Sequence, residues 1–536
     1  MGRGFTIGLA AFAATGSFLF GYDSGVMTDV IESKNFLAFF NTVQTSPIIG
    51  AINSTFSGGA ALGALQGGLT MDRFGRKFTI QMGAFICLVG AILQTAAQNL
   101  AMMLVGRILA GWAVGLLSMS VPVYQAECAH PRSRGFIIGL SQQMIGIGFI
   151  VSTYVSLAVQ WVGFGSLHAP ETSEFQWRFP LAFQTVPCLL LAVGMFFMPE
   201  SPRYLVEKER YEEGMKILRK LHYDGTNDEW IQTEFNEIRT TIEAEKAVTV
   251  SGWLIMFQVP QWRTRLLHGI AVQAFAQMTA VNVIGYYQTI LYNSLGITGG
   301  RNILVAGIYN CVGPVCNLIF IVFLLDKVGR RKPMLFGSIA VTIVLICEAA
   351  LTSVNEDGSR TSYSIAGVFF IFCITVIFSF SYGSCAWVYM AEVMPMQIRG
   401  RGNAVATSLG NWVVSTIWNQ VSPIAFGKIH WRFYLVFILF SKFSFPFRSE
   451  GVESEVETGY SYCFSPLDVC ITIPTVFFFF KETKQKSLEE IDLLFGGRAL
   501  GTLPENVEAK AAEAEMNKAE KTRDSYANVE HTENKV

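Results

Sequence analysis

The sequence is dominated by apolar runs that are each long enough to cross a lipid bilayer. A transmembrane helix needs about 18 or more apolar residues, and eleven such runs recur, with a twelfth that begins near residue 431 and is interrupted. The runs cover residues 7–27, 48–70, 78–97, 100–122, 136–160, 179–198, 266–292, 302–325, 333–353, 365–390 and 403–426. Only 15% of the residues are charged, against about 25% in soluble domains. We therefore expect an all-α membrane protein with twelve transmembrane helices.

The composition also argues against several classes of protein. Lys and Arg number 40 and Asp and Glu 41, so the chain lacks the overall positive charge that attracts nucleic acid. The ten Cys residues are scattered without paired spacing or His partners, which predicts no metal site. The sequence shows no phosphate-binding loop or nucleophile arrangement. We expect no enzyme activity and no cofactor, with energy supplied by gradients and not by ATP.

Positive charge marks one side of the membrane. Clusters of Lys and Arg lie in alternate loops, at residues 72–77, 132–134, 199–265, 326–332 and 399–401. Such loops face the cytoplasm, and an even number of spans places both termini on that side. The first run contains Asp23 and leads into further spans without a small-residue cleavage site, so we expect no cleavable signal. The expected location is the plasma membrane.

Two loop motifs recur in the second half of the chain. The motif Asp72-x-x-Gly-Arg-Lys returns 254 residues later as Asp326-x-x-Gly-Arg-Arg-Lys, and Glu127…Arg134-Gly135 returns 265 residues later as Glu392…Arg399-Gly400. Two six-helix halves that run in the same direction are a transporter architecture, with the substrate site between the halves near the membrane midplane. The expected divisions are an N-terminal half (1–198), a linker with short amphipathic helices (199–265), a C-terminal half (266–484) and a tail (485–536).

Short motifs occur in a fixed order along nearly the whole chain. They are Gly21-Tyr-Asp23, Gly106-Arg107, Pro122-Val-Tyr-Gln-Ala-Glu127 with Arg134-Gly135, Pro199-Glu-Ser-Pro-Arg203, Gln277…Asn282…Tyr286-Tyr287, Glu392…Arg399 and Lys481-Glu-Thr-Lys484. Over roughly residues 1–490 this set resembles the sugar porter family of the major facilitator superfamily, including its fungal proton-coupled monosaccharide transporters. The resemblance implies uptake of a hexose or pentose by proton symport and alternating access, in a monomer embedded in lipid. A facilitative uniporter and a non-transporting sugar sensor stay open as alternatives.

Asp23 is a carboxylate inside an apolar run. An unpaired charge at that depth costs several kcal/mol, so this side chain needs a partner or a proton, and Arg107 in the fourth run is the expected partner. A permanent ion pair and a protonation switch both fit these residues, because moving the arginine away from a buried carboxyl invites protonation. The resemblance favours proton coupling through Asp23 and Arg107.

A sugar offers hydroxyl groups and an apolar ring face but no charge, which suits carboxamide and aromatic side chains. The resemblance implies substrate binding by Gln142, Gln277, Asn282, Trp387, Asn411 and Trp412, and an outer gate at Tyr286 and Tyr287. Helix–helix hydrogen bonding is the alternative role for such carboxamides. Gly285 is expected to ease a bend beside Asn282. The residues Ala276, Ala280 and Ser384 depart from the family pattern and leave the identity of the sugar open.

Charged residues also gather at the expected cytoplasmic ends of the helices. Carboxylates and guanidiniums there can form bidentate pairs between neighbouring helices, which we expect to act as a latch when the cytoplasmic side is closed. The members are Asp72, Arg76, Glu127, Arg134, Glu200, Arg203, Asp326, Arg330, Glu392 and Arg399. A plain topology signal explains the arginines but not the paired acids.

The interrupted twelfth run contains a stretch that cannot cross hydrocarbon. Residues 431–440 begin a helix and residues 471–480 finish one, but Lys442, Arg448 and four Glu residues between 450 and 457 separate them. Charges and irregular backbone of this kind are excluded from the lipid-exposed core. We expect that about residues 441–465 are translated intron. A genuine loop that splits the helix is the alternative.

Overall fold

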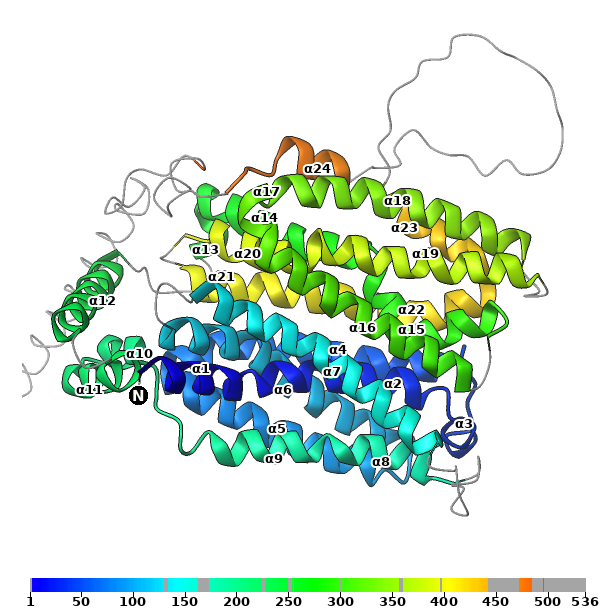
Figure 1. Ribbon diagram of the computed structural model, residues 1–536, viewed down its shortest axis with the longest axis horizontal. Helices are drawn as coiled ribbons and strands as arrows, with labels where there is room; N and C mark the ends of the chain where they lie inside the picture. Colours follow the sequence, from blue (N-terminus) through cyan, green and yellow to red (C-terminus); the bar gives the residue numbers. More distant parts are fainter. Residues whose placement is uncertain are drawn as a thin grey trace, which may run out of the picture.

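The computed structural model describes residues 2–129, 134–161, 173–223, 227–248, 253, 255–297, 300–355, 360–395, 398–441, 472–483 and 495. The regular elements among these residues are all helices, which confirms the all-α prediction. The long helices run along one axis and form an elongated bundle. In Figure 1 the N-terminal half, blue to cyan, lies beside the C-terminal half, green to orange.

The N-terminal half supplies the first six membrane spans. Its helices are α1 (Gly2–Ala13), α2 (Thr15–Val30), α3 (Lys34–Phe39), α4 (Pro47–Phe74), α5 (Arg76–Thr95), α6 (Leu100–Cys128), α7 (Arg134–Trp161), α8 (Phe175–Phe183) and α9 (Thr185–Gly194). Helices α1 and α2 together form the first span, and α8 and α9 form the sixth.

Glycines let the helices of this half approach closely. A Cβ atom at Gly111 of α6 would lie 1.9 Å from the backbone oxygen of Phe56 on α4. A Cβ atom at Gly21 of α2 would lie equally close, 1.9 Å, to the backbone oxygen of Ile145 on α7. Membrane helices associate through small-residue contacts of this kind, because lipid supplies no hydrophobic force that drives them together. The contacts hold α2, α4, α6 and α7 in one tight cluster.

The linker forms a separate group of short helices, α10 (Pro202–Glu207), α11 (Tyr211–His222), α12 (Asp228–Val248) and α13 (Ile255–Gln258). Helices α10 to α12 and the N-terminus lie at the same end of the bundle (Figure 1). We call this the linker end, and the opposite end the distal end.

The C-terminal half contains more broken helices than the first half. Its elements are α14 (Pro260–Met278), α15 (Val281–Ser294), α16 (Gly300–Phe323), α17 (Leu325–Val328), α18 (Arg331–Val354), α19 (Thr361–Ser379), α20 (Tyr382–Val393), α21 (Arg399–Ala406), the π-helical η3 (Thr407–Val413), α22 (Val414–Ile429), the 3₁₀ turn η4 (His430–Arg432), α23 (Phe433–Ser441) and α24 (Thr472–Phe478).

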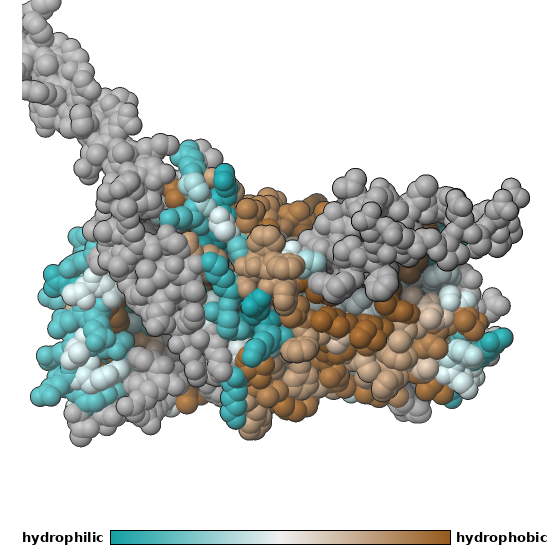
Figure 2. All heavy atoms as spheres, turned by 90° about the horizontal axis from the view of Figure 1, so that it is seen from above, coloured by the Kyte–Doolittle hydropathy of each residue, from teal (hydrophilic) through white to brown (hydrophobic). Residues whose placement is uncertain are grey.

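Within the described ranges, ten helical segments are long and apolar enough to cross a membrane. The eleventh expected span is the helix formed by α21, η3 and α22, and the twelfth is represented by α23 and α24, which both pack against α18. Residues 442–465, the bulk of the expected intron, lie outside the described residues. Figure 2 shows apolar side chains gathered over the bundle, with hydrophilic side chains at its ends, the arrangement that a bilayer requires.

Candidate functional site

Asp23 of α2 and Arg107 of α6 form an ion pair in the interior of the N-terminal half. Nη1 of Arg107 lies 3.0 Å from Oδ1 of Asp23, and the arginine and the aspartate are 0% and 1% exposed. Nε of the same guanidinium donates to the backbone oxygen of Ile52 over 3.3 Å. Among the described residues, Oδ2 of Asp23 has no hydrogen-bond partner. This carboxylate therefore keeps one oxygen at which a proton can bind.

Phe56 of α4 connects this ion pair to one of the expected sugar-binding residues. The guanidinium carbon of Arg107 lies 4.4 Å from the centre of the Phe56 ring. The same ring also meets Trp412 in η3, edge to face, with 6.3 Å between ring centres. Trp412 is buried, and its ring also meets Phe20 at 5.2 Å. The Phe56 ring therefore lies between Arg107 and Trp412, and a movement of Arg107 can displace Trp412 through it.

Three of the expected sugar-binding carboxamides form one chain of hydrogen bonds. Nδ2 of Asn282 donates to Oε1 of Gln277, and Nε2 of Gln277 donates to Oδ1 of Asn411. The three side chains come from α15, α14 and η3 respectively. Each amide carries both donors and an acceptor. A sugar hydroxyl can therefore insert into either of the two hydrogen bonds and leave no polar group unpaired.

The two remaining expected sugar-binding residues lie on other helices. Gln142 is half-buried on α7, and Trp387 is half-buried on α20, at the edge of an apolar cluster that includes Tyr389 and Met390. No described contact joins Gln142 or Trp387 to the three-amide chain.

The seventh span is broken between α14 and α15, at Ala280. Its φ of 63° places Ala280 in the left-handed region, which costs roughly 1–2 kcal/mol for a residue with a Cβ atom. A second irregularity follows at Tyr287, with φ −127°. The span thus has a break at Ala280 and a kink at Tyr287, two residues after Gly285, which is expected to ease a bend. Broken helices are typical of binding sites within transporters, and Asn282 lies immediately after this break.

The expected gate residues hold α15 against its neighbours toward the distal end. The hydroxyl of Tyr287 donates to the backbone oxygen of Asn419 on α22 over 2.6 Å. The hydroxyl of Tyr286 lies 3.4 Å from Oγ of Ser24 on α2. Two threonine hydroxyls add bonds between α2 and α15, from Thr28 to the oxygen of Gly285 and from Thr289 to the oxygen of Thr28. These bonds join α2 to α15 toward the distal end.

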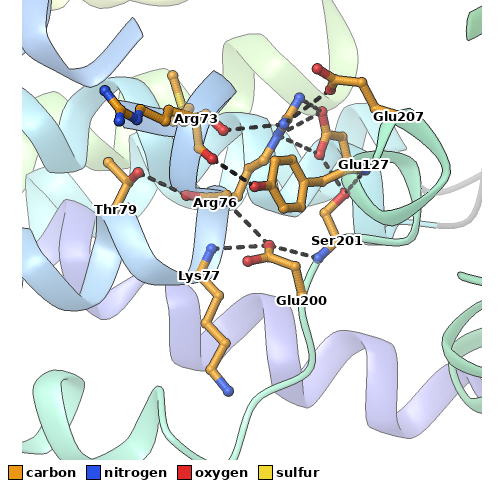
Figure 3. A network of polar contacts seen from close by, with 11 residues as sticks. Arg73, Arg76, Lys77, Thr79, Glu127, Glu200, Ser201 and Glu207 are labelled. Atoms are coloured by element: carbon orange, nitrogen blue, oxygen red, sulfur yellow. Dashed lines mark hydrogen bonds and ion pairs between the residues drawn. The ribbon is translucent and has the colours of Figure 1, made fainter. Parts of the chain in front are cut away.

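At the linker end of the first half, Arg76 is held by two carboxylates (Figure 3). Its guanidinium lies 3.0 Å from Oε2 of Glu127 and 3.4 Å from Oε2 of Glu207. The hydroxyl of Ser201 also donates to Glu127. Oε1 of Glu200 accepts the backbone N–H groups of Arg76, Lys77 and Ser201 at 3.2, 3.1 and 2.8 Å. The first two N–H groups begin α5, so Glu200 caps this helix and complements its positive dipole end.

The second half repeats most of this network, with Arg330, Glu392, Glu482 and Thr483 in the places of Arg76, Glu127, Glu200 and Ser201. Nη2 of Arg330 lies 3.0 Å from Oε1 of Glu392, and Thr483 donates its hydroxyl to the same carboxylate over 2.7 Å. Glu482 accepts the backbone N–H groups of Arg330 and Arg331 at 3.0 and 3.1 Å, as the N-terminus of α18 begins. The internal repeat therefore extends to a second acid after the last span.

Both networks depend on a glycine turn. Gly75 and Gly329 have φ of 96° and 91°. A Cβ atom would lie 2.4 Å from a Glu200 oxygen at the first position and 2.8 Å from a Glu482 oxygen at the second. Only glycine satisfies both the conformation and the space.

Of the other five expected latch residues, the structure describes the side chains of three, Asp72, Arg203 and Arg399. Asp72 acts electrostatically on Arg76 and on Arg401 of α21, and so relates the two halves at the linker end. Arg203 lies in α10, and Nε of Arg399 donates to the backbone oxygen of Met394 over 3.3 Å. The side chains of Arg134 and Asp326 lie outside the described residues.

The two networks contain residues that are not among the predicted latch residues. These are Ser201, Glu207, Glu482 and Thr483. The pairs Glu200-Ser201 and Glu482-Thr483 are a visible repeat that could have found three of them. Phe56 carried no such signal, because it is one of 43 Phe residues.

We expect Glu200→Ala to lower the unfolding temperature of the purified protein, while Glu200→Gln has little effect. The alanine leaves three backbone N–H groups without their acceptor, at a cost of about 1 kcal/mol or more for each buried group. The glutamine keeps a carbonyl oxygen for them. The same two substitutions at Glu482 are the matched control in the other half. Equal unfolding temperatures for the alanine and glutamine variants would contradict this role.

Glu200→Gln is also expected to change the pH dependence of the protein's stability. Burial raises the pKa of the Glu200 carboxyl and that of Glu207 above their usual values. The folded protein therefore keeps these protons at a pH at which the unfolded chain has released them. The associated stability is present below the ordinary glutamate pKa and is lost as the pH rises through the raised value. Glu200→Gln removes its share of this dependence.

Comparison with known proteins connects the chain to transporters. The sugar (and other) transporter family matches residues 9–495. The MFS-type transporter criB of Aspergillus cristatus is 34% identical over 96% of this chain and 99% of that protein. A high-affinity glucose transporter of Kluyveromyces lactis is 29% identical, over 90% of this chain and 84% of that protein. The high glucose sensor of Saccharomyces cerevisiae is 32% identical, over 90% of this chain but 60% of that protein.

A solved structure confirms the fold. The proton:xylose symporter XylE bound to 6-bromo-6-deoxy-D-glucose superposes with a TM-score of 0.71, over 92% of this chain and 100% of that one, at 21% sequence identity. That symporter is a protein of the major facilitator superfamily. The chain is therefore a multi-pass membrane protein with the major facilitator fold, and it belongs to the sugar (and other) transporter family.

Proposed function

We propose that this protein takes up a monosaccharide, a hexose or a pentose, by proton symport and alternating access. The observation that carries the proposal is the buried pair of Asp23 and Arg107, whose guanidinium contacts Trp412 through the Phe56 ring. A permanent ion pair would need no such connection to a substrate pocket. No charged substrate group is required, because the pocket residues are neutral.

The chemistry of the pair supplies the coupling. While Arg107 stays within 3.0 Å of Asp23, its charge favours the ionised carboxylate. A proton on the free Oδ2 removes that attraction and releases the guanidinium. Arg107 can then shift against Phe56, which moves the wall that Trp412 forms. Sugar binding at Trp412 acts on the pair in the reverse direction, as linkage between two sites requires.

The charged loops support an orientation of the chain in the membrane. We place the linker end in the cytoplasm and the distal end outside, since the Lys- and Arg-rich segments gather at the linker end. Both termini are then cytoplasmic, and the described conformation is closed toward the outside by the contact of α2 with α15. The location that fits nutrient uptake is the plasma membrane.

The sugar itself is recognised by neutral groups. Gln277, Asn282 and Asn411 offer donors and acceptors from one hydrogen-bonded chain, and Trp412 and Trp387 offer ring faces for the apolar side of a sugar. The name of the Kluyveromyces lactis relative refers to glucose, and the solved symporter holds a glucose derivative. These names support a monosaccharide as the substrate class.

We expect Gln142→Ala, Gln277→Ala and Asn282→Ala each to raise the half-saturation concentration for uptake. The loss of one hydrogen bond costs about 1 kcal/mol, which corresponds to a change of roughly fivefold. The readout is uptake of labelled sugar by a transporter-null host, with surface expression measured in parallel. Gln273→Ala is the matched control, because Gln273 is equally buried on α14 but contacts the sulfur of Met390.

Lower expression with an unchanged half-saturation concentration would instead support a role in helix packing. No uptake of any sugar, despite normal expression, would favour a sensor. Uptake that never exceeds the outside concentration would favour a uniporter.

A further inference from the structure

The C-terminal half contains a buried carboxyl that the proposed coupling does not use. Glu348 lies on α18, toward its distal end, and is 0% exposed. Its Oε2 has no hydrogen-bond partner within the described residues. Its Oε1 has one weak contact, 3.5 Å from the hydroxyl of Thr352 one turn later. Glu348 thus makes weaker polar contacts than Asp23, which has an ion pair with Arg107, although both carboxyls lie inside membrane spans.

Among the residues that the structure describes, the surroundings of Glu348 hold hydroxyls but no positive charge. Tyr292 of α15 and Tyr434 of α23 are the titratable groups that interact with it from neighbouring helices. On α19, a Cβ atom at Gly367 would lie 3.4 Å from Oε1, so the α19 backbone covers the carboxyl on that side. No Lys, Arg or His in the described part of the chain acts on Glu348. The hydroxyl of Tyr292 is itself buried without a partner there.

An ionised carboxylate would be costly in this position. Removing a charge from water without a counter-ion costs far more than removing a neutral carboxyl, which needs only ordinary hydrogen bonds. Ionisable residues within membrane spans are rare for this reason and usually serve in ion pathways. The packing described around Glu348 therefore fits the protonated carboxyl.

Tyr292 connects Glu348 to the gate. It lies on α15, the helix whose Tyr286 and Tyr287 close the distal side against α2 and α22. An ionised Glu348 would need water, and a movement of α15 away from α18 would let water reach it. Because Tyr286 and Tyr287 lie on α15, that movement would loosen their contacts with α2 and α22.

We propose that Glu348 is a second proton-binding site, separate from Asp23, and that its protonation allows α15 to close the distal gate. The inference rests on the proposed proton symport. Protons from the outer side would protonate Glu348, and the gate could close only after that. Asp23 then couples the proton to the sugar, while Glu348 couples a proton to the gate.

The test is exchange of labelled sugar in proteoliposomes with equal sugar concentration and equal pH on both sides, from pH 6 to 10. Asp23→Asn removes titration at the coupling pair. In that background we expect exchange to fall about tenfold per pH unit above the midpoint, since the rate follows the protonated fraction of one carboxyl. Adding Glu348→Gln, which mimics the protonated form, should make exchange independent of pH. Adding Thr342→Val instead, on the same helix, should leave the fall unchanged.

Several outcomes would overturn the proposal. They are a pH-independent Asp23→Asn protein, an Asp23→Asn/Glu348→Gln protein that still falls with pH, and a Glu348→Gln protein that does not fold. If the Asp23→Asn protein shows no exchange, the pH profile of exchange is compared between Glu348→Gln and the unchanged chain. Identical profiles would contradict a role for Glu348. Sugar accumulation by Asp23→Asn in a pH gradient would contradict the symport proposal itself, independently of any result at Glu348.

Discussion

Asp23→Asn is expected to abolish accumulation of sugar against its gradient while leaving exchange across the membrane. Asparagine keeps the shape of the side chain and can still accept a bond from Arg107, but it cannot bind and release a proton. The interaction with the guanidinium then stays the same throughout the transport cycle. The proton gradient therefore cannot drive accumulation of the sugar. The measurement is the steady-state ratio of inside to outside sugar, together with exchange at equal concentrations.

Asp29→Asn is the matched control for this substitution. Asp29 lies on the same helix, six residues further on, and is as buried as Asp23, at 1% exposed. It makes no described ion pair, and its neighbours on α7 are the hydroxyls of Thr153 and Ser156. We expect Asp29→Asn to keep accumulation. If Asp23→Asn still concentrates sugar, the coupling role of Asp23 is wrong.

Removing about residues 441–465 is expected to increase surface expression and uptake severalfold. Helices α23 and α24 have 9 and 7 residues, about 14 and 11 Å of helix, and neither crosses a core of about 30 Å. Both pack against α18, and α24 leads directly to Glu482 and Thr483 of the second network. A direct connection would join the two helices into one continuous twelfth span. Its backbone polar groups would then be hydrogen-bonded within the helix and not left unpaired in lipid.

The internal repeat locates the extra residues. Glu127 and Glu392 are 265 positions apart, but Glu200 and Glu482, which make equivalent contacts, are 282 apart. The 17 additional residues therefore lie between Glu392 and Glu482, where the charged stretch occurs. We propose that this stretch is translated intron.

A variant in which residues 442–465 are replaced by a Gly/Ser segment of equal length is the control. It removes the charges but keeps the helix divided, and we expect no improvement. Sequencing the mature transcript decides the origin of the stretch. If every message retains the codons for Glu450 to Glu457, or if the shortened form loses uptake, the intron proposal is wrong.

The bundle was predictable because lipid imposes a simple rule on length and polarity. Apolar runs predict the spans, and the recurring Asp-x-x-Gly-Arg motifs predict two halves. Asp23 and Arg107 could be paired in advance, since each is a lone charge in an apolar run. The same reasoning would have singled out Glu348, which lies inside the run 333–353 and was passed over.

Other features left no mark in the sequence. The break in the seventh span occurs at Ala280, a residue that favours helix, so tertiary packing and not local preference must hold its left-handed conformation. The contact of Phe56 with both Arg107 and Trp412 depends on how closely α4, α6 and η3 approach, which composition does not reveal.

The most direct test of proton-coupled sugar uptake is a time course with a panel of labelled sugars in a transporter-null host, with and without a protonophore. Proton symport predicts that at least one hexose or pentose accumulates above its outside concentration. It also predicts that the protonophore brings the inside concentration down to the outside value. Accumulation that persists with the protonophore, or uptake that never exceeds the outside concentration for any sugar, would contradict proton symport.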